Sequence, residues 1–188
     1  MVRYATQTGR YAWRCGSDYS RVTGVMFQGF SESDVVIRPF IEADRKILMQ
    51  IYLESRRETF KWLDTSSMSL TDFDRDTAGE AIWVATQDDN LVGFVSVYQA
   101  ENFIHNLFIL TKWLSQGVGS QLLKTALANV GRPARLKCLV QNTRAISFYR
   151  EKGWKKVGEG SSEDGEYHLL QLITEKPASE KGKQKQGV

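Results

Sequence analysis

The feature that most constrains this chain is the stretch from Asn106 to Ala126, where an apolar run, two closely spaced glycines and a helical pattern follow one another. The apolar run at 107–110 is typical of the end of a buried strand. From 118 to 126, apolar residues recur at the spacing of one helix face. Gly117 and Gly119 lie between the two and, because they lack Cβ, allow a tight turn. The stretch therefore predicts a strand, a glycine turn and a helix in succession.

A helix N-terminus that follows such a turn is a candidate anion site. The first backbone N–H groups of a helix have no intrahelical partner, and the helix dipole adds partial positive charge. A phosphate or pyrophosphate is the ligand that this arrangement favours. The spacing matches neither a Walker loop nor the dinucleotide fingerprint. A tight turn that binds no ligand is equally compatible with these residues taken alone.

Apolar patterns along the rest of the chain predict further strands and helices. Strands are expected at 34–40, 81–85, 91–98, 103–109, 136–140, 154–157 and 167–172, and helices at 42–53, 54–63, 117–129 and 143–152, with a short helix within 64–80. The strand at 91–98 is apolar on both alternating faces, with Val92 and Phe94 on one and Val95 on the other, which predicts a central strand covered on both sides. The order of elements favours an α+β fold with a mixed, mostly antiparallel central sheet flanked by helices.

Residues 34–174 are expected to form one domain between two segments of different composition. Residues 1–33 mix aromatic residues with Gly, Arg and Ser without a clear period, which favours a loosely ordered extension or a true start near Met26. Residues 175–188 are rich in Lys, Glu, Gln and Gly, which is typical of a disordered polar tail.

Charge and cysteine content narrow the range of partners. The net charge of +3 is small and owes much to the C-terminal tail, so nucleic acid is not expected as a partner. Cys15 and Cys138 offer neither a disulfide framework nor metal-ligand spacing, so no metal is expected and a cytoplasmic location is favoured. Cys138 lies in an apolar run and is interpreted as a core residue. No apolar stretch reaches transmembrane length, so no membrane partner is expected.

A second segment, from Gln141 to Trp154, is expected to begin at the end of a strand and continue as a helix. Asn142 lies where the helix should start, a position that favours Asn as an N-cap or as a polar contact to a ligand. Tyr149 follows seven residues later, about two helical turns, so both residues lie roughly on one helix face. They could point together into a cleft beside the strand end, although a cap and a core tyrosine would give the same pattern.

Together the two segments resemble the GNAT superfamily of acetyl-CoA-dependent N-acetyltransferases, over roughly residues 34–174. The family's glycine motif, Arg/Gln-x-x-Gly-x-Gly/Ala, is matched by Gly117 and Gly119. Its pattern N-x-x-A-x-x-F-Y-x-x-x-G-F/W is matched at Asn142, Ala145, Phe148, Tyr149, Gly153 and Trp154. The chain departs from the family at Leu114, where Arg or Gln is usual, which removes one side-chain contact to the pyrophosphate. Gln116 lies two residues later and could substitute in part.

The resemblance implies how acetyl-CoA would bind as the co-substrate. The backbone of Leu107 and Ile109 would pair with the pantetheine arm, beside a strand that splays from its neighbour. Amides of the glycine turn would hold the pyrophosphate, which assigns this role to Gln116, Gly117, Val118, Gly119 and Ser120. Asn142 would contact the pantetheine. Tyr149 would lie by the thioester sulfur as the general acid.

The resemblance also implies direct attack by a primary amine of a small molecule, amino acid, peptide or protein, with a base that accepts its proton. His105 is the first candidate, because neutral imidazole titrates near neutral pH. Glu101, Glu54, Glu58 or water are the alternatives. The backbone N–H near Ile109 would polarise the acetyl carbonyl.

Residues 54–63 would form part of the acceptor wall, and Arg56 and Arg57 either bind an acidic group there or form a solvated helix face. A non-catalytic acyl-CoA-binding sensor or interaction module of the same fold is the alternative function, favoured only by Leu114. The family often forms dimers, so a homodimer is compatible with the resemblance.

Overall fold

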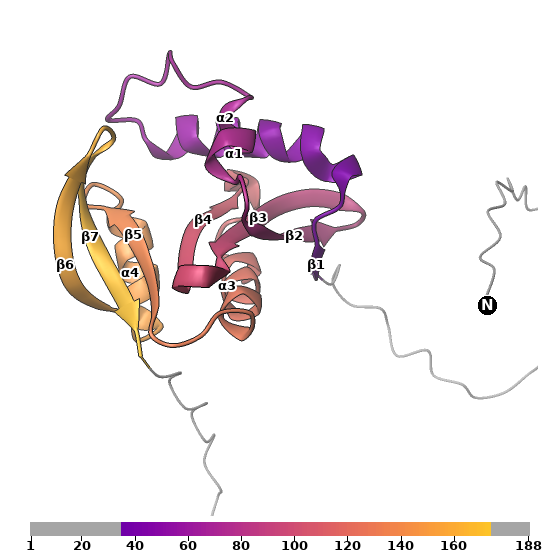
Figure 1. Cartoon of the computed structure of the whole chain (residues 1–188). Helices are drawn as coiled ribbons and strands as arrows, with labels where there is room; N and C mark the ends of the chain where they lie inside the picture. Colours follow the sequence, from indigo (N-terminus) through magenta and orange to yellow (C-terminus); the bar gives the residue numbers. More distant parts are fainter. Residues whose placement is uncertain (1–34, 174–188) are drawn as a thin grey trace, which may run out of the picture. The chain divides into compact units, whose positions relative to one another are not determined.

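The computed structural model describes residues 35–173, so the predictions for residues 1–33 and for the tail 175–188 lie outside the described residues. Within them, a seven-stranded sheet has the order β1-β2-β3-β4-β5-β7-β6 (Figure 1). The strands are β1 (Val36–Pro39), β2 (Ala81–Gln87), β3 (Asn90–Tyr98), β4 (Phe103–Ile109), β5 (Ala134–Leu139), β6 (Lys155–Ser162) and β7 (Gly165–Leu172). The helices are α1 (Arg45–Thr59), α2 (Asp72–Asp76), α3 (Val118–Ala128) and α4 (Thr143–Glu151).

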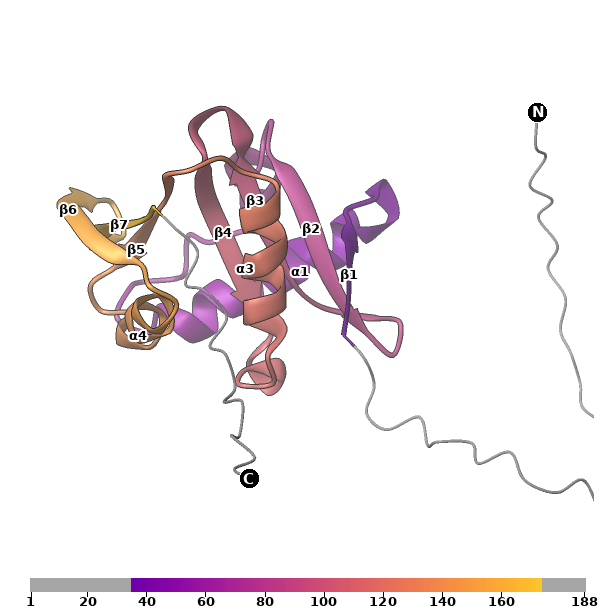
Figure 2. The same ribbon diagram turned by 90° about the horizontal axis from the view of Figure 1, so that it is seen from below.

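The sheet is mixed and mostly antiparallel, as the sequence predicts. Among residues 35–173, β4 and β5 are the one parallel pair, and every other neighbouring pair is antiparallel. α3 and α1 lie on opposite faces of the β2–β4 region (Figure 2). Each described helix is too short or too polar to cross a membrane.

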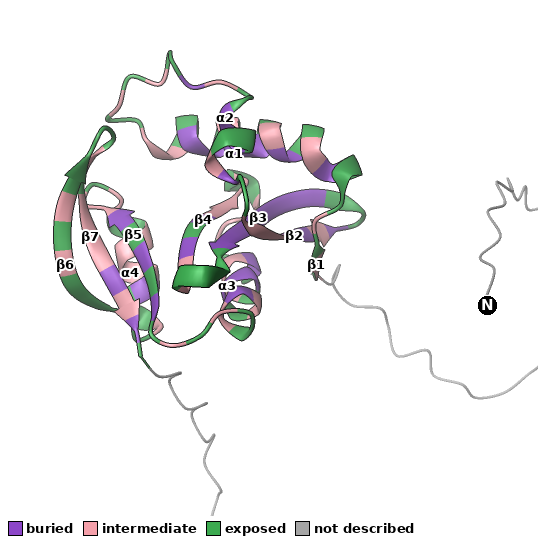
Figure 3. Ribbon diagram, viewed as in Figure 1, coloured by how far each residue is buried: buried purple, intermediate pink, exposed green. Residues whose placement is uncertain are grey.

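β3 is the central strand, and it is buried from Leu91 to Val97 (Figure 3). On one face it packs with α3 and α4, and on the other with α1 and α2. This confirms the prediction that both faces are covered. The prediction that Val92 and Phe94 lie on the same face is wrong. Val92 packs with buried residues of α3, whereas Phe94 packs with buried residues of α1. The β2–β3 register skips residue 92, and this bulge turns its side chain to the other face.

The region predicted as two helices, 42–53 and 54–63, is instead a 3-10 turn at Glu42–Asp44 followed by the continuous helix α1. The predicted break is wrong because the buried stripe of α1 runs across it. Leu48, Ile51, Tyr52, Ser55 and Arg56 recur at helical spacing and are buried. α1 therefore extends to Thr59 and brings its last turn toward the end of β4.

The final hairpin is also longer than predicted. β6 runs to Ser162 rather than ending at 157, and a two-residue turn joins it to β7. β6 is an edge strand, and most of its residues are exposed, so its sequence lacks the apolar alternation of a half-buried strand.

Candidate active site

The site is built where β4 and β5 separate. The two strands pair at only two positions, Phe103 with Arg135 and Ile104 with Leu136. Beyond these, β4 stays paired with β3 alone, up to Ile109. The Leu110 N–H donates to the β3 carbonyl of residue 92 at 2.9 Å. Since successive residues of a strand alternate in direction, the backbone groups of residues 107 and 109 face away from β3, toward the gap.

A cleft of about 860 Å³ opens at this gap and continues between α3, α4 and the end of α1. Seven of the residues expected to act here line it: Leu107, Ile109, Gly117, Gly119, Ser120, Asn142 and Tyr149. The structure thus brings together the strand end, the glycine turn and the second segment. Three expected residues, His105, Gln116 and Val118, do not line the cleft.

The two glycines of the turn serve different purposes. Gly117 caps α3 with φ +84°, a left-handed conformation that favours glycine. At Gly119 a Cβ would lie 3.1 Å from Cδ1 of Ile109, so glycine allows α3 to approach β4 closely. Val118 is buried in the core, so only its backbone can serve a ligand.

Some backbone N–H groups of this turn donate hydrogen bonds within the helix, and others are free to bind a ligand. Ser120 and Gln121 both donate to the carbonyl of Gly117, at 3.0 and 3.1 Å. The N–H groups of residues 117–119 precede the first donor of the helix and have no intrahelical partner. Gln116 uses its side-chain Nε2 to donate to the Lys112 carbonyl at 2.7 Å. The turn can therefore present three successive amides to an anion.

We expect the substitution Gly117→Ala to destabilise the protein by roughly 1–2 kcal/mol, because a Cβ is strained at positive φ. Gly117→Asn should cost less, since Asn tolerates the left-handed region better than Ala. Urea unfolding monitored by circular dichroism measures both. Equal stability of the Ala variant and the wild type would contradict the role of φ at this position.

Asn142 is the N-cap of α4. Its Oδ1 accepts a hydrogen bond from the Ala145 N–H at 3.1 Å, which confirms the capping interpretation. The side chain also lines the cleft. Because the cap uses only the oxygen, the Nδ2 group remains as a donor toward a ligand.

Tyr149 lies on the buried face of α4 and is 8% exposed. Its ring packs edge-on against Phe148 and Trp154, with centroids 5.2 and 5.6 Å away. Burial raises the pKa of the Tyr149 phenol well above its usual value, with a smaller contribution from the Cys138 thiol. The group stays a neutral proton donor at any physiological pH. Cys138 is buried, as expected of a core residue, and burial raises the pKa of its thiol to about 11.

Among the four side chains proposed as the base, Glu58 alone lines the cleft. It lies in the last turn of α1, and its Oε2 accepts a hydrogen bond from the Thr111 hydroxyl. Glu54, one turn earlier, is exposed and outside the cleft, as is Glu101.

His105 lies on β4 directly after Ile104, the last residue that pairs with β5. The β3–β4 register skips residue 105, so it occupies a bulge. Its Nδ1 contacts the carboxylate of Glu80, whose side chain is only 4% exposed. Its ring packs against Phe103, with centroids 4.7 Å apart. Sequence patterns gave no sign of Glu80, because it precedes β2 and meets His105 only in the folded sheet.

Arg56 and Arg57 do not face the cleft. The Arg56 guanidinium is buried, forms an ion pair with Asp72 at 2.9 Å and lies over the ring of Tyr52. Arg57 donates to the Met68 carbonyl at 3.0 Å. Both side chains hold the segment after α1 in place, so the proposal that they bind an acidic acceptor is not supported.

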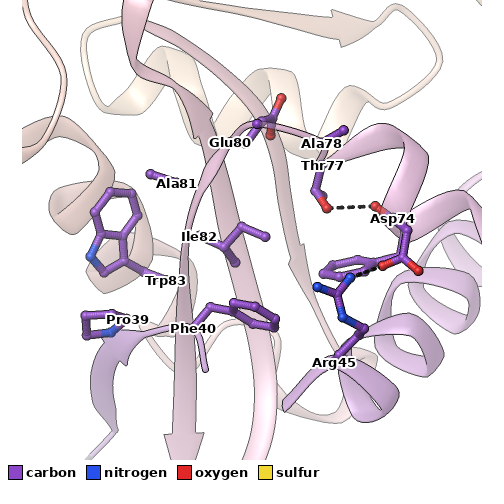
Figure 4. Close-up of a pocket in the computed structure, with 12 residues that line it drawn as sticks. Pro39, Phe40, Arg45, Asp74, Thr77, Ala78, Glu80, Ala81, Ile82 and Trp83 are labelled. Atoms are coloured by element: carbon purple, nitrogen blue, oxygen red, sulfur yellow. Dashed lines mark hydrogen bonds and ion pairs between the residues drawn. The ribbon is translucent and has the colours of Figure 1, made fainter. Parts of the chain in front are cut away.

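A second hollow, of about 580 Å³, lies between β2 and the end of α2 and shares no lining residue with the cleft. Figure 4 shows Arg45 directed toward Asp74 at this hollow. The Arg45 Nε also donates a hydrogen bond to Oε1 of Glu42 at 2.6 Å. Arg45 is therefore shared between two carboxylates, and the other carboxylate of the lining, Glu80, contacts His105. This leaves the described lining of the hollow without a free cation for an anionic ligand.

Comparison with protein families finds a match to the acetyltransferase (GNAT) domain over residues 52–169. An uncharacterised N-acetyltransferase of Archaeoglobus fulgidus is 26% identical over 140 residues, which cover 69% of this chain and 90% of the relative. The peptidyl-lysine N-acetyltransferase YjaB of Salmonella typhimurium is 34% identical over 95 residues, covering 49% of this chain and 63% of that protein.

The fold is also that of solved acetyltransferases. The PaiA N-acetyltransferase of Thermoplasma acidophilum, solved in complex with coenzyme A, superposes with a TM-score of 0.58 at 19% identity. The alignment covers 73% of this chain and 98% of that protein. The family match spans more than half of the chain and includes β4, the glycine turn and α4. The chain therefore belongs to the GNAT family of N-acetyltransferases.

Proposed function

We propose that the cleft binds acetyl-CoA along the free edge of β4 and transfers its acetyl group to a primary amine. The observation that carries this proposal is the early separation of β4 from β5 beside the N-terminus of α3. The pantetheine arm of an acyl-CoA carries amides that can pair with a strand edge, and its pyrophosphate suits a helix N-terminus. The PaiA relative binds coenzyme A, which supports the same class of ligand here.

In this proposal the backbone groups of Leu107 and Ile109 pair with the pantetheine arm, and the three free amides of 117–119 hold the pyrophosphate. Ser120 also lines the cleft, but its N–H already donates to the Gly117 carbonyl. Asn142 donates from Nδ2 to a pantetheine carbonyl, since its Oδ1 is used by the cap.

The chemistry is a direct displacement at the acetyl carbonyl. The amine nitrogen attacks the carbonyl carbon and loses a proton to the base, while an N–H of β4 near Ile109 stabilises the developing oxyanion. The carbon–sulfur bond then breaks, and the sulfur takes the phenolic proton of Tyr149, which solvent restores. The products are the acetylated amine and coenzyme A.

We assign the base role to Glu58, because it lines the cleft on the side of α1. His105 is the second candidate. Its contact with Glu80 through Nδ1 would leave Nε2 as the proton acceptor, which then reaches the amine through water.

The acceptor proposed here is a lysine-like amine. Glu58, Trp62 and Phe108 line the α1 side of the cleft. A carboxylate attracts an ammonium group, and an aromatic face accommodates an alkyl chain that bears a cation. One relative is named a peptidyl-lysine N-acetyltransferase, which supports a lysine side chain as the acceptor class.

Calorimetric titration with acetyl-CoA is the test of the cofactor assignment, and we expect roughly micromolar affinity. Thiol release should then follow with an N-terminally blocked, lysine-containing peptide, and not with a free-N-terminus peptide that lacks lysine. Absence of binding at about millimolar cofactor would overturn the assignment. Binding without transfer to any amine would instead favour a non-catalytic acyl-CoA sensor.

A further inference from the structure

We propose that Arg144 binds the pyrophosphate of acetyl-CoA and replaces the side chain that the family usually supplies at position 114. This inference rests on the proposed function, because it concerns the same cofactor. It adds a residue from α4 to a site otherwise made by the glycine turn. It also explains how the chain retains a cofactor site despite its departure from the family motif.

Arg144 supplies positive charge to the cleft. Three charged residues line the described cleft, and Arg144 is the only cation among them, beside Glu58 and Glu151. A coenzyme A molecule carries several negative charges on its phosphates. The dipole of α3 supplies only partial charge. A full positive charge at the phosphate end would strengthen binding, and Arg144 is the lining residue that provides it.

The Arg144 side chain extends from α4 toward the glycine turn. Arg144 lies in the first turn of α4, two residues after Asn142, and its side chain reaches across to the glycine turn. There its Nη2 donates to the Ser115 hydroxyl at 3.1 Å. Ser115 has φ +64°, an uncommon conformation for a residue with a side chain. The guanidinium is thus bonded to the segment that leads into the glycine turn, two residues before the first free amide.

The Arg144 guanidinium is available to bind a ligand. Arg144 is exposed, and within residues 35–173 it has no ion-pair partner. The bond to Ser115 uses only one of its N–H groups, so the planar fork can still bind two phosphate oxygens. Leu114 also lines the cleft but offers no polar atom beyond its backbone. The polar contact is therefore supplied from another helix.

The test is calorimetric titration of the full-length protein with acetyl-CoA and with its 3′-dephospho analogue. We expect Arg144→Ala to weaken binding of both by about ten- to hundred-fold, the usual effect of losing a charged hydrogen-bonding group. Arg150→Ala is the matched control, because Arg150 is exposed on the same helix and does not line the cleft. The double variant Leu114→Arg, Arg144→Ala should recover most of the affinity.

The outcomes separate this inference from the proposed function. Failure of the wild type to bind acetyl-CoA would overturn the proposed function itself. Normal wild-type binding with equal affinity in the Arg144→Ala and Arg150→Ala variants would overturn only the role of Arg144. A loss seen with acetyl-CoA but not with the dephospho analogue would place the contact at the 3′-phosphate and overturn the pyrophosphate assignment.

Discussion

Replacing Tyr149 with Phe should lower kcat about a hundred-fold, which is the low end of the range for general acid catalysis. The affinity for acetyl-CoA should stay unchanged. The effect is at the low end because a thiol, with a pKa of about 8.5, leaves readily even without a proton donor. Phe preserves the ring that packs against Phe148 and Trp154, so the fold should persist. Steady-state kinetics and calorimetric titration measure the two quantities.

The pH dependence provides a second test of Tyr149. An exposed phenol ionises at about pH 10 and would then stop donating. Burial raises the pKa of Tyr149, so the group stays protonated as the pH rises through that value and should cause no alkaline loss of wild-type activity there. Tyr98→Phe is the control, because Tyr98 lies outside the cleft. Equal kcat for Tyr149→Phe and Tyr98→Phe would remove Tyr149 from the mechanism.

The parts of the site that could be predicted from the sequence depend on local backbone chemistry. Gly117 adopts the positive φ that a glycine before a helix suggests, and Asn142 caps α4. The separation of β4 from β5 has no local signal, because both strands have ordinary apolar sequences. Only the family resemblance predicted it.

The parts that could not be predicted depend on partners distant in the sequence. The polar run at the end of α1 suggests a helix boundary, yet Arg56 is buried there because Asp72 compensates its charge from 16 residues away. The contact between Glu80 and His105 joins residues 25 apart. Arg144 meets Ser115 across 29 residues. Which carboxylate faces the cleft therefore follows from tertiary packing, and sequence reasoning left the base among five alternatives.

The base can be identified by comparing variants at Glu58 and His105. We expect Glu58→Gln to lower kcat/KM by about 10²- to 10³-fold at neutral pH, as for loss of a general base. The defect should shrink as the pH approaches about 10.4, the ordinary pKa of a lysine amine, because more acceptor then arrives already neutral. Activity against pH with a lysine peptide measures both effects.

Glu54→Gln is a matched control for this prediction, because Glu54 lies one turn earlier on the same helix, is exposed and does not line the cleft. It should leave the kinetics unchanged. His105→Gln tests the alternative base. If His105→Gln shows the large defect that recovers at high pH and Glu58→Gln does not, the base lies on β4 and Glu80 acts by orienting it. Glu58 would then contribute only to attracting the ammonium group, and its replacement would raise KM without lowering kcat.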